Sequence, residues 1–125
     1  MGTGKHGKMG LNTYPKRGEI YLVNLDPTVG AEINKTRPAL IISNDINNQF
    51  SDTVTVIPIT SYVEKVYPFE VLLLAVENGL SKNSKAKCNQ IRTIDKQRLI
   101  KSLGKLRHEI MEEVEEATKI HLKMK

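Results

Sequence analysis

The chain has 125 residues, of which 39% are hydrophobic and 26% are charged, and its net charge is +5. These values are typical of one soluble globular domain and exclude a disordered chain. The charge is sorted along the sequence: residues 18–78 hold three basic and eight acidic side chains, whereas residues 79–107 hold nine basic and one acidic. The segment 79–107 is therefore the better electrostatic indication of an anionic partner.

Several other classes of protein are excluded by sequence features. The longest apolar runs, such as Val71–Val76, are too short to cross a bilayer, and no export signal pattern is found. Cys88 is the single cysteine, which excludes an internal disulfide and a cysteine-rich metal site. His6, His108 and His121 have no partners at ligand spacing, so neither a metal nor a cofactor is expected. We expect a cytoplasmic protein that does not contact a membrane.

The predicted elements begin after a tail. Residues 1–16 are rich in glycine and lysine and predict a flexible tail, and residues 17–125 are expected to form one domain. Residues 44–52 and 77–85 are rich in turn-forming residues and are expected to be loops. Pro58, inside the third predicted strand, indicates an edge strand or a bulge. Six strands are predicted, at residues 19–26, 38–43, 53–60, 68–75, 86–94 and 99–106.

The final segment, residues 108–125, has a different period. Ile110, Val114, Ala117 and His121 recur at helical spacing, and the acids lie early while the lysines lie late, as the helix dipole favours. No Ser, Thr, Asp or Asn immediately precedes the segment, so a weak N-cap is predicted. The fold class expected is mainly β with a C-terminal α-helix, arranged as a small, strongly bent β-barrel.

Arg37 stands close before Ala39–Ile42, an aliphatic stretch that is typical of a strand buried on both sides. Its guanidinium has a fork of donors matched to a phosphate and is charged at physiological pH. Pro38 fixes the backbone beside it and biases Arg37 toward an extended conformation. Two interpretations stay open, a solvated surface arginine or a fixed cation directed at an anionic group.

Other side chains have a similar pair of interpretations. Thr60 and Ser61 end the third predicted strand, where hydroxyl groups either satisfy turn backbone or contact a ligand. Gln90 and Arg92 are two residues apart on the fifth predicted strand, so they would share one face and either read nucleotide edges or coat the surface. Phe50, in a polar segment, would either stack on a base or make a small satellite core contact.

Five sequence blocks in consistent order resemble one family. They are "RGEI" at the first strand, "LDPTVGAE", "RPALIIS", "PIT" and "QIRTIDKQRL". Together they resemble the MazF/PemK endoribonuclease toxins of bacterial toxin–antitoxin systems. The resemblance extends from Arg17 to the C-terminal helix, so it covers the domain expected at residues 17–125 and leaves only the tail outside.

The resemblance implies the SH3-like small β-barrel of the CcdB/Kid/MazF toxins, and a homodimer. It implies sequence-specific, metal-independent cleavage of single-stranded RNA, mostly mRNA, by attack of the 2′-hydroxyl. Arg37 matches the catalytic arginine and Thr60 the catalytic hydroxyl residue. A cognate antitoxin with an acidic C-terminal segment is the expected protein partner. The residues expected to bind RNA are Glu32, Thr36, Phe50, Ser61, Gln90 and Arg92.

One departure from the family pattern concerns Cys88 and Asn89, which stand where relatives often carry a hydrophobic residue and an acid. This departure bears on which bases are recognised rather than on the chemistry. Two other functions stay open, a CcdB-type gyrase-binding toxin without nuclease activity and a non-catalytic RNA-binding barrel. The blocks "TRP" and "PIT" favour the nuclease, because a gyrase-binding protein has no need of them.

Overall fold

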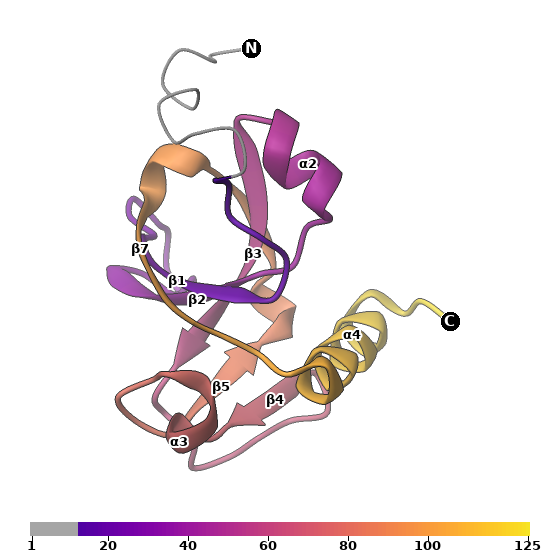
Figure 1. Cartoon of the computed structure of the whole chain (residues 1–125). Helices are drawn as coiled ribbons and strands as arrows, with labels where there is room; N and C mark the ends of the chain where they lie inside the picture. Colours follow the sequence, from indigo (N-terminus) through magenta and orange to yellow (C-terminus); the bar gives the residue numbers. More distant parts are fainter. Residues whose placement is uncertain (1–12) are drawn as a thin grey trace.

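The computed structural model describes residues 13–125, so most of the tail predicted at residues 1–16 lies outside the described residues. Figure 1 shows a strongly bent sheet with α4 packed beside it. The predicted fold class, mainly β with a C-terminal helix, is confirmed. The elements are β1 (Glu19–Asn24), β2 (Thr36–Ile41), α2 (Asp45–Phe50), β3 (Thr53–Thr60), β4 (Glu70–Leu73), α3 (Ala75–Asn78), β5 (Ser84–Lys87), η1 (Cys88–Gln90), β6 (Arg92–Asp95), η2 (Lys96–Arg98), β7 (Leu99–Lys105) and α4 (His108–Leu122).

The strands pair antiparallel in the order β4-β5-β3-β2-β1-β7, and β6 also pairs with β3. β3 is central, because it pairs with β2 along one side and with β6 and then β5 along the other. The edge position predicted from Pro58 is therefore wrong. On the β6/β5 side the ladder with β6 ends at Val56 and the ladder with β5 begins at Ile59. Pro58 is tolerated in this interval, where that side of β3 has no ladder partner.

Two predicted segments are divided differently in the structure. The fifth predicted strand, residues 86–94, is split between β5 and β6 by the 3₁₀ helix η1, which is one turn long. Gln90 lies in that turn and Arg92 in β6, so the prediction that they share one strand face is wrong. The short helix α2 forms where a loop was expected, and α3 runs from Ala75, the last residue of the fourth predicted strand, into the loop expected at residues 77–85. The side chain of Asn44 caps α2 by accepting from the backbone N–H of Asn47 at 2.8 Å.

Alternating side chains on the strands build two buried clusters. Leu40 belongs to the cluster that α4 covers, and Ala39 and Ile41 belong to the cluster on the other face of β2. β2 is therefore buried on both faces, as its aliphatic sequence predicts. α4 contributes Met111, Val114 and Ala117, and the N-cap residue Arg107 makes no side-chain capping bond, as predicted.

Cys88 lies in η1 beneath α4 and has no exposed surface. Its Sγ is 3.9 Å from the carbonyl oxygens of Ala86 and Val114. Burial raises the pKa of the Cys88 thiol, so this side chain acts as a small core residue rather than as a nucleophile. Among the helices of residues 13–125, none is long and apolar enough to span a membrane.

Candidate functional site

The register of β2 against β3 brings Arg37 and Thr60 to one place. Ala39 pairs with Pro58 in the last pair of the β2–β3 ladder, and the same register continued by two residues would bring Arg37 opposite Thr60. Residues directly opposite each other in an antiparallel pair have side chains on the same face. On this face Ala39 belongs to an apolar cluster, and Arg37 and Thr60 stand where the face becomes polar.

A pocket of about 470 Å³ opens at this point. Its walls come from the β1–β2 loop, from the ends of β2 and β3, from the loop between β3 and β4, and from β5 with η1. It is lined by Gly30, Ala31, Glu32, Ile33, Asn34, Arg37, Thr60, Tyr62, Lys65, Tyr67, Lys85, Lys87 and Gln90.

Arg37 is half-buried, and its guanidinium is held from one side. Nε donates a hydrogen bond of 2.8 Å to the carbonyl oxygen of Asn34. Among residues 13–125, the two terminal nitrogens have no hydrogen-bond partner. The side chain is therefore oriented while its outer fork of donors stays available to an anion in the pocket.

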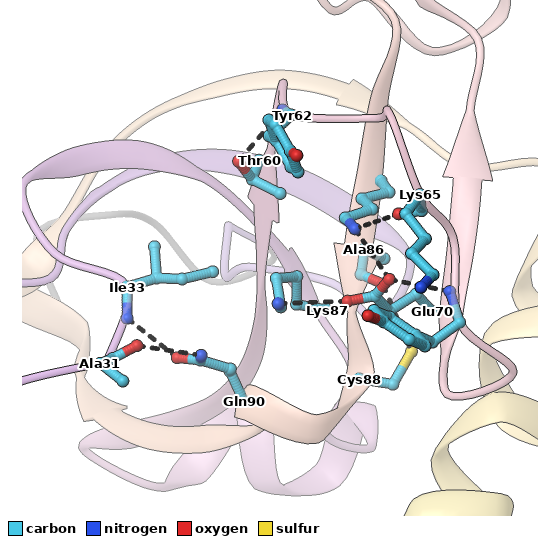
Figure 2. Close-up of polar contacts among 12 residues, drawn as sticks. Ala31, Ile33, Thr60, Tyr62, Lys65, Glu70, Ala86, Lys87, Cys88 and Gln90 are labelled. Carbon is cyan, nitrogen blue, oxygen red and sulfur yellow. Dashed lines mark hydrogen bonds and ion pairs between the residues drawn. The ribbon is translucent and has the colours of Figure 1, made fainter.

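Thr60 is oriented by the chain that follows it (Figure 2). Its Oγ1 accepts a hydrogen bond of 3.2 Å from the backbone N–H of Tyr62. A hydroxyl group has one donor and two acceptor positions, so an acceptor position is used and the O–H remains able to donate. Arg37 and Thr60 thus both present donors to the same pocket.

Gln90 fixes the loop that forms one wall of the pocket (Figure 2). Its Oε1 accepts from the backbone N–H of Ile33 at 2.9 Å, and its Nε2 donates to the carbonyl oxygen of Ala31 at 3.3 Å. Glu32 closes the same loop, because its Oε1 accepts from the backbone N–H of Val29 at 2.7 Å. The loop conformation is therefore specified by side chains, which is necessary because a loop has no ladder of its own.

Glu70 is the buried anchor of the opposite wall (Figure 2). Its side chain has no exposed surface and lies 2.8 Å from Lys85 Nζ and 3.1 Å from Lys87 Nζ. Its Oε1 also accepts from the backbone N–H of Tyr67 at 3.0 Å, and Lys85 Nζ donates to the carbonyl oxygen of Lys65. The loop between β3 and β4 is thereby tied to the floor of the pocket.

The charge state of Glu70 follows from these contacts. Burial alone would raise the pKa of Glu70, because a carboxylate loses its hydration inside a protein. Hydrogen bonds from Lys85 and from the backbone of Tyr67, together with the nearby Lys87 ammonium, outweigh burial, and the pKa of Glu70 is lowered. Glu70 is therefore ionised at neutral pH.

Four of the predicted site residues line the pocket, and four do not. Glu32, Arg37, Thr60 and Gln90 are brought together. Thr36 is the exposed first residue of β2, where strand alternation turns it to the face opposite Arg37, and Ser61 is exposed directly after the end of β3. Phe50 and Arg92 lie outside the pocket.

Phe50 ends α2, which precedes the first residue of β3, whereas Thr60 is the last residue of that strand. A strand of 8 residues separates the two ends by roughly 20 Å. Arg92 pairs with Val56 in the middle of β3, and its Nη1 donates to the carbonyl oxygen of Leu25 at 3.2 Å. The predicted contacts of Phe50 and Arg92 with RNA stay predictions, and they would lie outside this pocket.

Outside the β1–β2 loop, five residues that line the pocket were not identified from the sequence. Only two of the nine basic side chains of segment 79–107, Lys85 and Lys87, line the pocket. Their alternation in "SKAK" is the signal that places them on one strand face. The others are Tyr62, Lys65 and Tyr67, which lie in a loop where periodicity gives no direction.

Comparison with known proteins gives a consistent family match. Residues 16–122 match the family described as PemK-like, MazF-like toxin of type II toxin–antitoxin system. Endoribonuclease MazF9 of Mycobacterium tuberculosis is 43% identical over 112 residues, which cover 86% of this chain and 95% of that protein. Endoribonuclease EndoA of Bacillus subtilis is 44% identical over 108 residues, which cover 86% and 93%.

Solved structures share the fold. MazF of Deinococcus radiodurans (form I) is 26% identical and superposes with a TM-score of 0.79, over 90% of this chain and 100% of that chain. A MazE–MazF structure from the same organism (form II) is 26% identical with a TM-score of 0.72, over 91% and 100%. The expectation of a MazF-type fold is confirmed.

The Glu70 cluster predicts how stability responds to acid. The folded-state pKa of Glu70 is lowered, so the unfolded chain takes up a proton first as the pH falls. The contribution of Glu70 is therefore present above the ordinary carboxyl range and is lost as the pH falls through the folded-state pKa. Urea unfolding between neutral pH and about pH 3 measures this loss, and Glu70→Gln should show a shallower pH dependence.

At neutral pH, Glu70→Gln should lower the free energy of unfolding by about 3 kcal/mol or more, because it leaves two lysines without their buried counter-charge. The matched control is Glu77→Gln, which removes the surface ion pair with Arg107 and should cost at most about 1 kcal/mol. Equal losses for the two variants would contradict the role given to Glu70.

Proposed function

Because this chain belongs to the MazF/PemK family of toxins from type II toxin–antitoxin systems, we propose that it is an endoribonuclease. Its substrate is single-stranded RNA, chiefly mRNA, cut at specific short sequences without a metal ion. The observation that carries the proposal is that Arg37 and Thr60 line one pocket and both have hydrogen-bond donors available to it. The endoribonuclease names of MazF9 and EndoA support the same reaction class.

The reaction needs little from the protein beyond geometry and charge. The substrate carries its own nucleophile: the 2′-oxygen attacks the adjacent phosphorus, the bond to the 5′-oxygen breaks, and the products end in a 2′,3′-cyclic phosphate and a 5′-hydroxyl. The 2′-hydroxyl loses its proton, and the leaving 5′-oxygen gains one. The protein must align the attacking and leaving oxygens and stabilise the extra negative charge of the five-coordinate phosphorus.

Arg37 is suited to the charge. Its outer donors match the planar arrangement of two phosphate oxygens, and the bond from Nε to Asn34 keeps them aimed before substrate arrives. Thr60 donates its O–H to the same phosphate while Tyr62 holds its oxygen. We assign to Arg37 the stabilisation of the phosphate. A role of Arg37 in proton transfer rests only on the family resemblance.

The two pocket loops set the space that RNA enters. Gln90 uses both ends of its amide on the loop, so in this state it positions the wall rather than reading a base. Glu32 is exposed and is the one carboxylate among the residues that line the pocket. We propose that base recognition involves this loop and requires it to move when RNA binds.

The partner assignments extend the proposal. We propose a homodimer inhibited by a cognate antitoxin whose acidic C-terminal segment occupies the RNA pocket. Lys65, Lys85, Lys87 and Arg37 bring four positive charges to the pocket, which suits an acidic peptide as well as RNA. The MazE–MazF structures of D. radiodurans support the existence of such a partner.

The first prediction concerns activity. Purified protein should cut a long single-stranded RNA at a few short motifs in the presence of EDTA and leave the cyclic phosphate and 5′-hydroxyl ends. A DNA of the same sequence should remain intact, because it lacks the 2′-hydroxyl. Gel analysis with end-group labelling measures both. Cleavage of DNA, or loss of RNA cleavage in EDTA, contradicts the mechanism, and absence of any cleavage favours the gyrase-binding or non-catalytic alternatives.

The second prediction concerns the two proposed catalytic residues. Arg37→Ala should lower the cleavage rate about a hundredfold or more, the scale for losing one preorganised donor. Thr60→Ala should also lower the rate, and Thr60→Ser, which keeps the hydroxyl, should retain most of it. Arg107→Ala is the matched control, because this exposed arginine pairs with Glu77 outside the pocket. A folded Arg37→Ala variant with undiminished cleavage returns Arg37 to a surface role.

The third prediction concerns the antitoxin. A synthetic acidic peptide from the C-terminal segment of the cognate antitoxin should compete with RNA for the protein, and its binding should weaken as salt increases. Competition is measured by fluorescence anisotropy of a labelled RNA, and the oligomeric state by sedimentation at the same concentrations. Simultaneous binding of peptide and RNA, or a monomer at concentrations where cleavage occurs, refutes the shared pocket or the dimer.

A further inference from the structure

Two lysine ammonium groups share one buried carboxylate in the pocket wall. Glu70 Oε1 lies 2.8 Å from Lys85 Nζ, and Glu70 Oε2 lies 3.1 Å from Lys87 Nζ. One negative charge between two positive charges leaves a surplus of one positive charge at this wall. Because the carboxylate is fully buried and the pocket is open, the surplus is directed toward the pocket, where it favours an anion.

Lys85 has its donors occupied by the protein. Only 4% of its side chain is exposed, and its Nζ donates to Glu70 and to the carbonyl oxygen of Lys65. The same ammonium lies 5.7 Å from the ring centroid of Tyr62 and 5.9 Å from that of Tyr67. With two of its three N–H donors used and its side chain almost fully buried, Lys85 ties the loop between β3 and β4 in place and offers little to a ligand.

Lys87 differs from Lys85 in both respects. A larger share of its side chain, 24%, is exposed, and Glu70 is its only ion-pair or hydrogen-bond partner among residues 13–125. Two of its three N–H donors are therefore available. Figure 2 shows Lys87 between Glu70 on one side and Gln90 with the Ala31–Ile33 loop on the other, within the pocket that all of them line except the buried Glu70.

The sheet register sets the distance between Lys87 and the proposed catalytic pair. Thr60 pairs with Lys85 across the β3–β5 ladder, and Lys87 lies two residues further along β5. The three side chains share one face, and diagonal neighbours of this kind have Cβ atoms roughly 7 Å apart. This separation is comparable to that of neighbouring phosphates along an extended RNA strand.

We propose that Lys87, held in place by Glu70, binds the RNA phosphate next to the one that is cleaved. The assignment rests on the proposed function, in which Arg37 and Thr60 hold the scissile phosphate. Glu70 stands directly opposite Lys87 in the β4–β5 ladder and restrains its ammonium before RNA arrives, so less side-chain freedom is lost on binding. The contact is made equally in the ground state and in the transition state, so it acts on KM rather than on kcat.

The salt dependence of RNA binding tests this assignment. The probe is a mixed-sequence 2′-O-methyl oligoribonucleotide, which cannot be cleaved because its nucleophile is blocked. Loss of one phosphate contact should reduce the slope of log K against log[KCl] by about 0.7 for a single strand. Lys87→Gln is expected to show this reduction, Lys87→Arg to keep the original slope, and the control Lys101→Gln, an exposed residue of β7, to leave it unchanged.

Cleavage kinetics give an independent readout. Lys87→Gln should raise KM about tenfold at low salt with kcat little changed, because one charge-assisted contact contributes equally to both states. If the ion pair between Lys87 and Glu70 were merely structural, its loss would lower the free energy of unfolding and leave the slope of log K against log[KCl] unchanged. Lys87→Met serves as a second neutral variant if Lys87→Gln does not fold, and far-UV circular dichroism checks both.

An unchanged salt slope in a folded neutral variant overturns the assignment, as does an equal reduction in Lys101→Gln. If the original protein cleaves RNA in EDTA and the slope is unchanged, only the assignment of Lys87 fails. If the original protein neither cleaves nor binds RNA, the proposed function fails together with it.

Discussion

The antiparallel register between β2 and β3 is the constraint on which the site depends. Pairing of Ala39 with Pro58 sets the register that brings the guanidinium of Arg37 and the hydroxyl of Thr60 to one pocket, and backbone hydrogen bonds rather than loop conformation hold this register. A slip of one residue would turn Arg37 to the other face of the sheet. The buried aliphatic residues of β2 and β3 resist such a slip, because it would also expose their apolar side chains. The register that buries the core is therefore also the register that positions the side chains of the site.

The loops that enclose the pocket are held in a different way. Each is attached by polar side chains: Gln90 and Glu32 bond the wall that includes Ala31 and Ile33, and Glu70 and Lys85 bond the wall that includes Lys65 and Tyr67. A few hydrogen bonds hold each wall, whereas the strand ends between them are held by a continuous ladder and a buried core. The arrangement separates a rigid reacting centre from walls that have few bonds to break when a long polymer enters.

The sequence predicts the elements whose side chains follow a clear periodic pattern and misses those without such a pattern. β3 was predicted with its observed bounds, because alternating β-branched residues have a clear period. The split of the fifth predicted strand was missed, because no glycine or proline marks the 3₁₀ turn at Cys88–Gln90. Arg37 and Thr60 were predicted as catalytic residues from the family resemblance of motifs at strand ends, and both line the pocket.

Lys85 and Lys87 were missed as site residues because their meaning depends on Glu70, which is distant in sequence and reaches them through the pairing of β4 with β5. From the sequence alone, a lysine beside a loop is interpreted as a solvated surface charge, because its buried counter-ion is not known. The position of Phe50 outside the pocket could not be predicted for a related reason, since a polar segment gives no indication of which end of a strand it will cover. Long-range pairing decides both cases.

The burial of the single thiol links its reactivity to opening of the fold. Cys88 is buried where η1 meets α4, and its Sγ lies 3.9 Å from the carbonyl oxygens of Ala86 and Val114. An alkylating or oxidising reagent reaches it only after the helix has moved off the sheet, so covalent labelling of the native chain reports that motion without any introduced probe. Disulfide-linked pairs of this protein would for the same reason be assemblies of opened molecules, and handling without a reductant leaves the packed form unmodified.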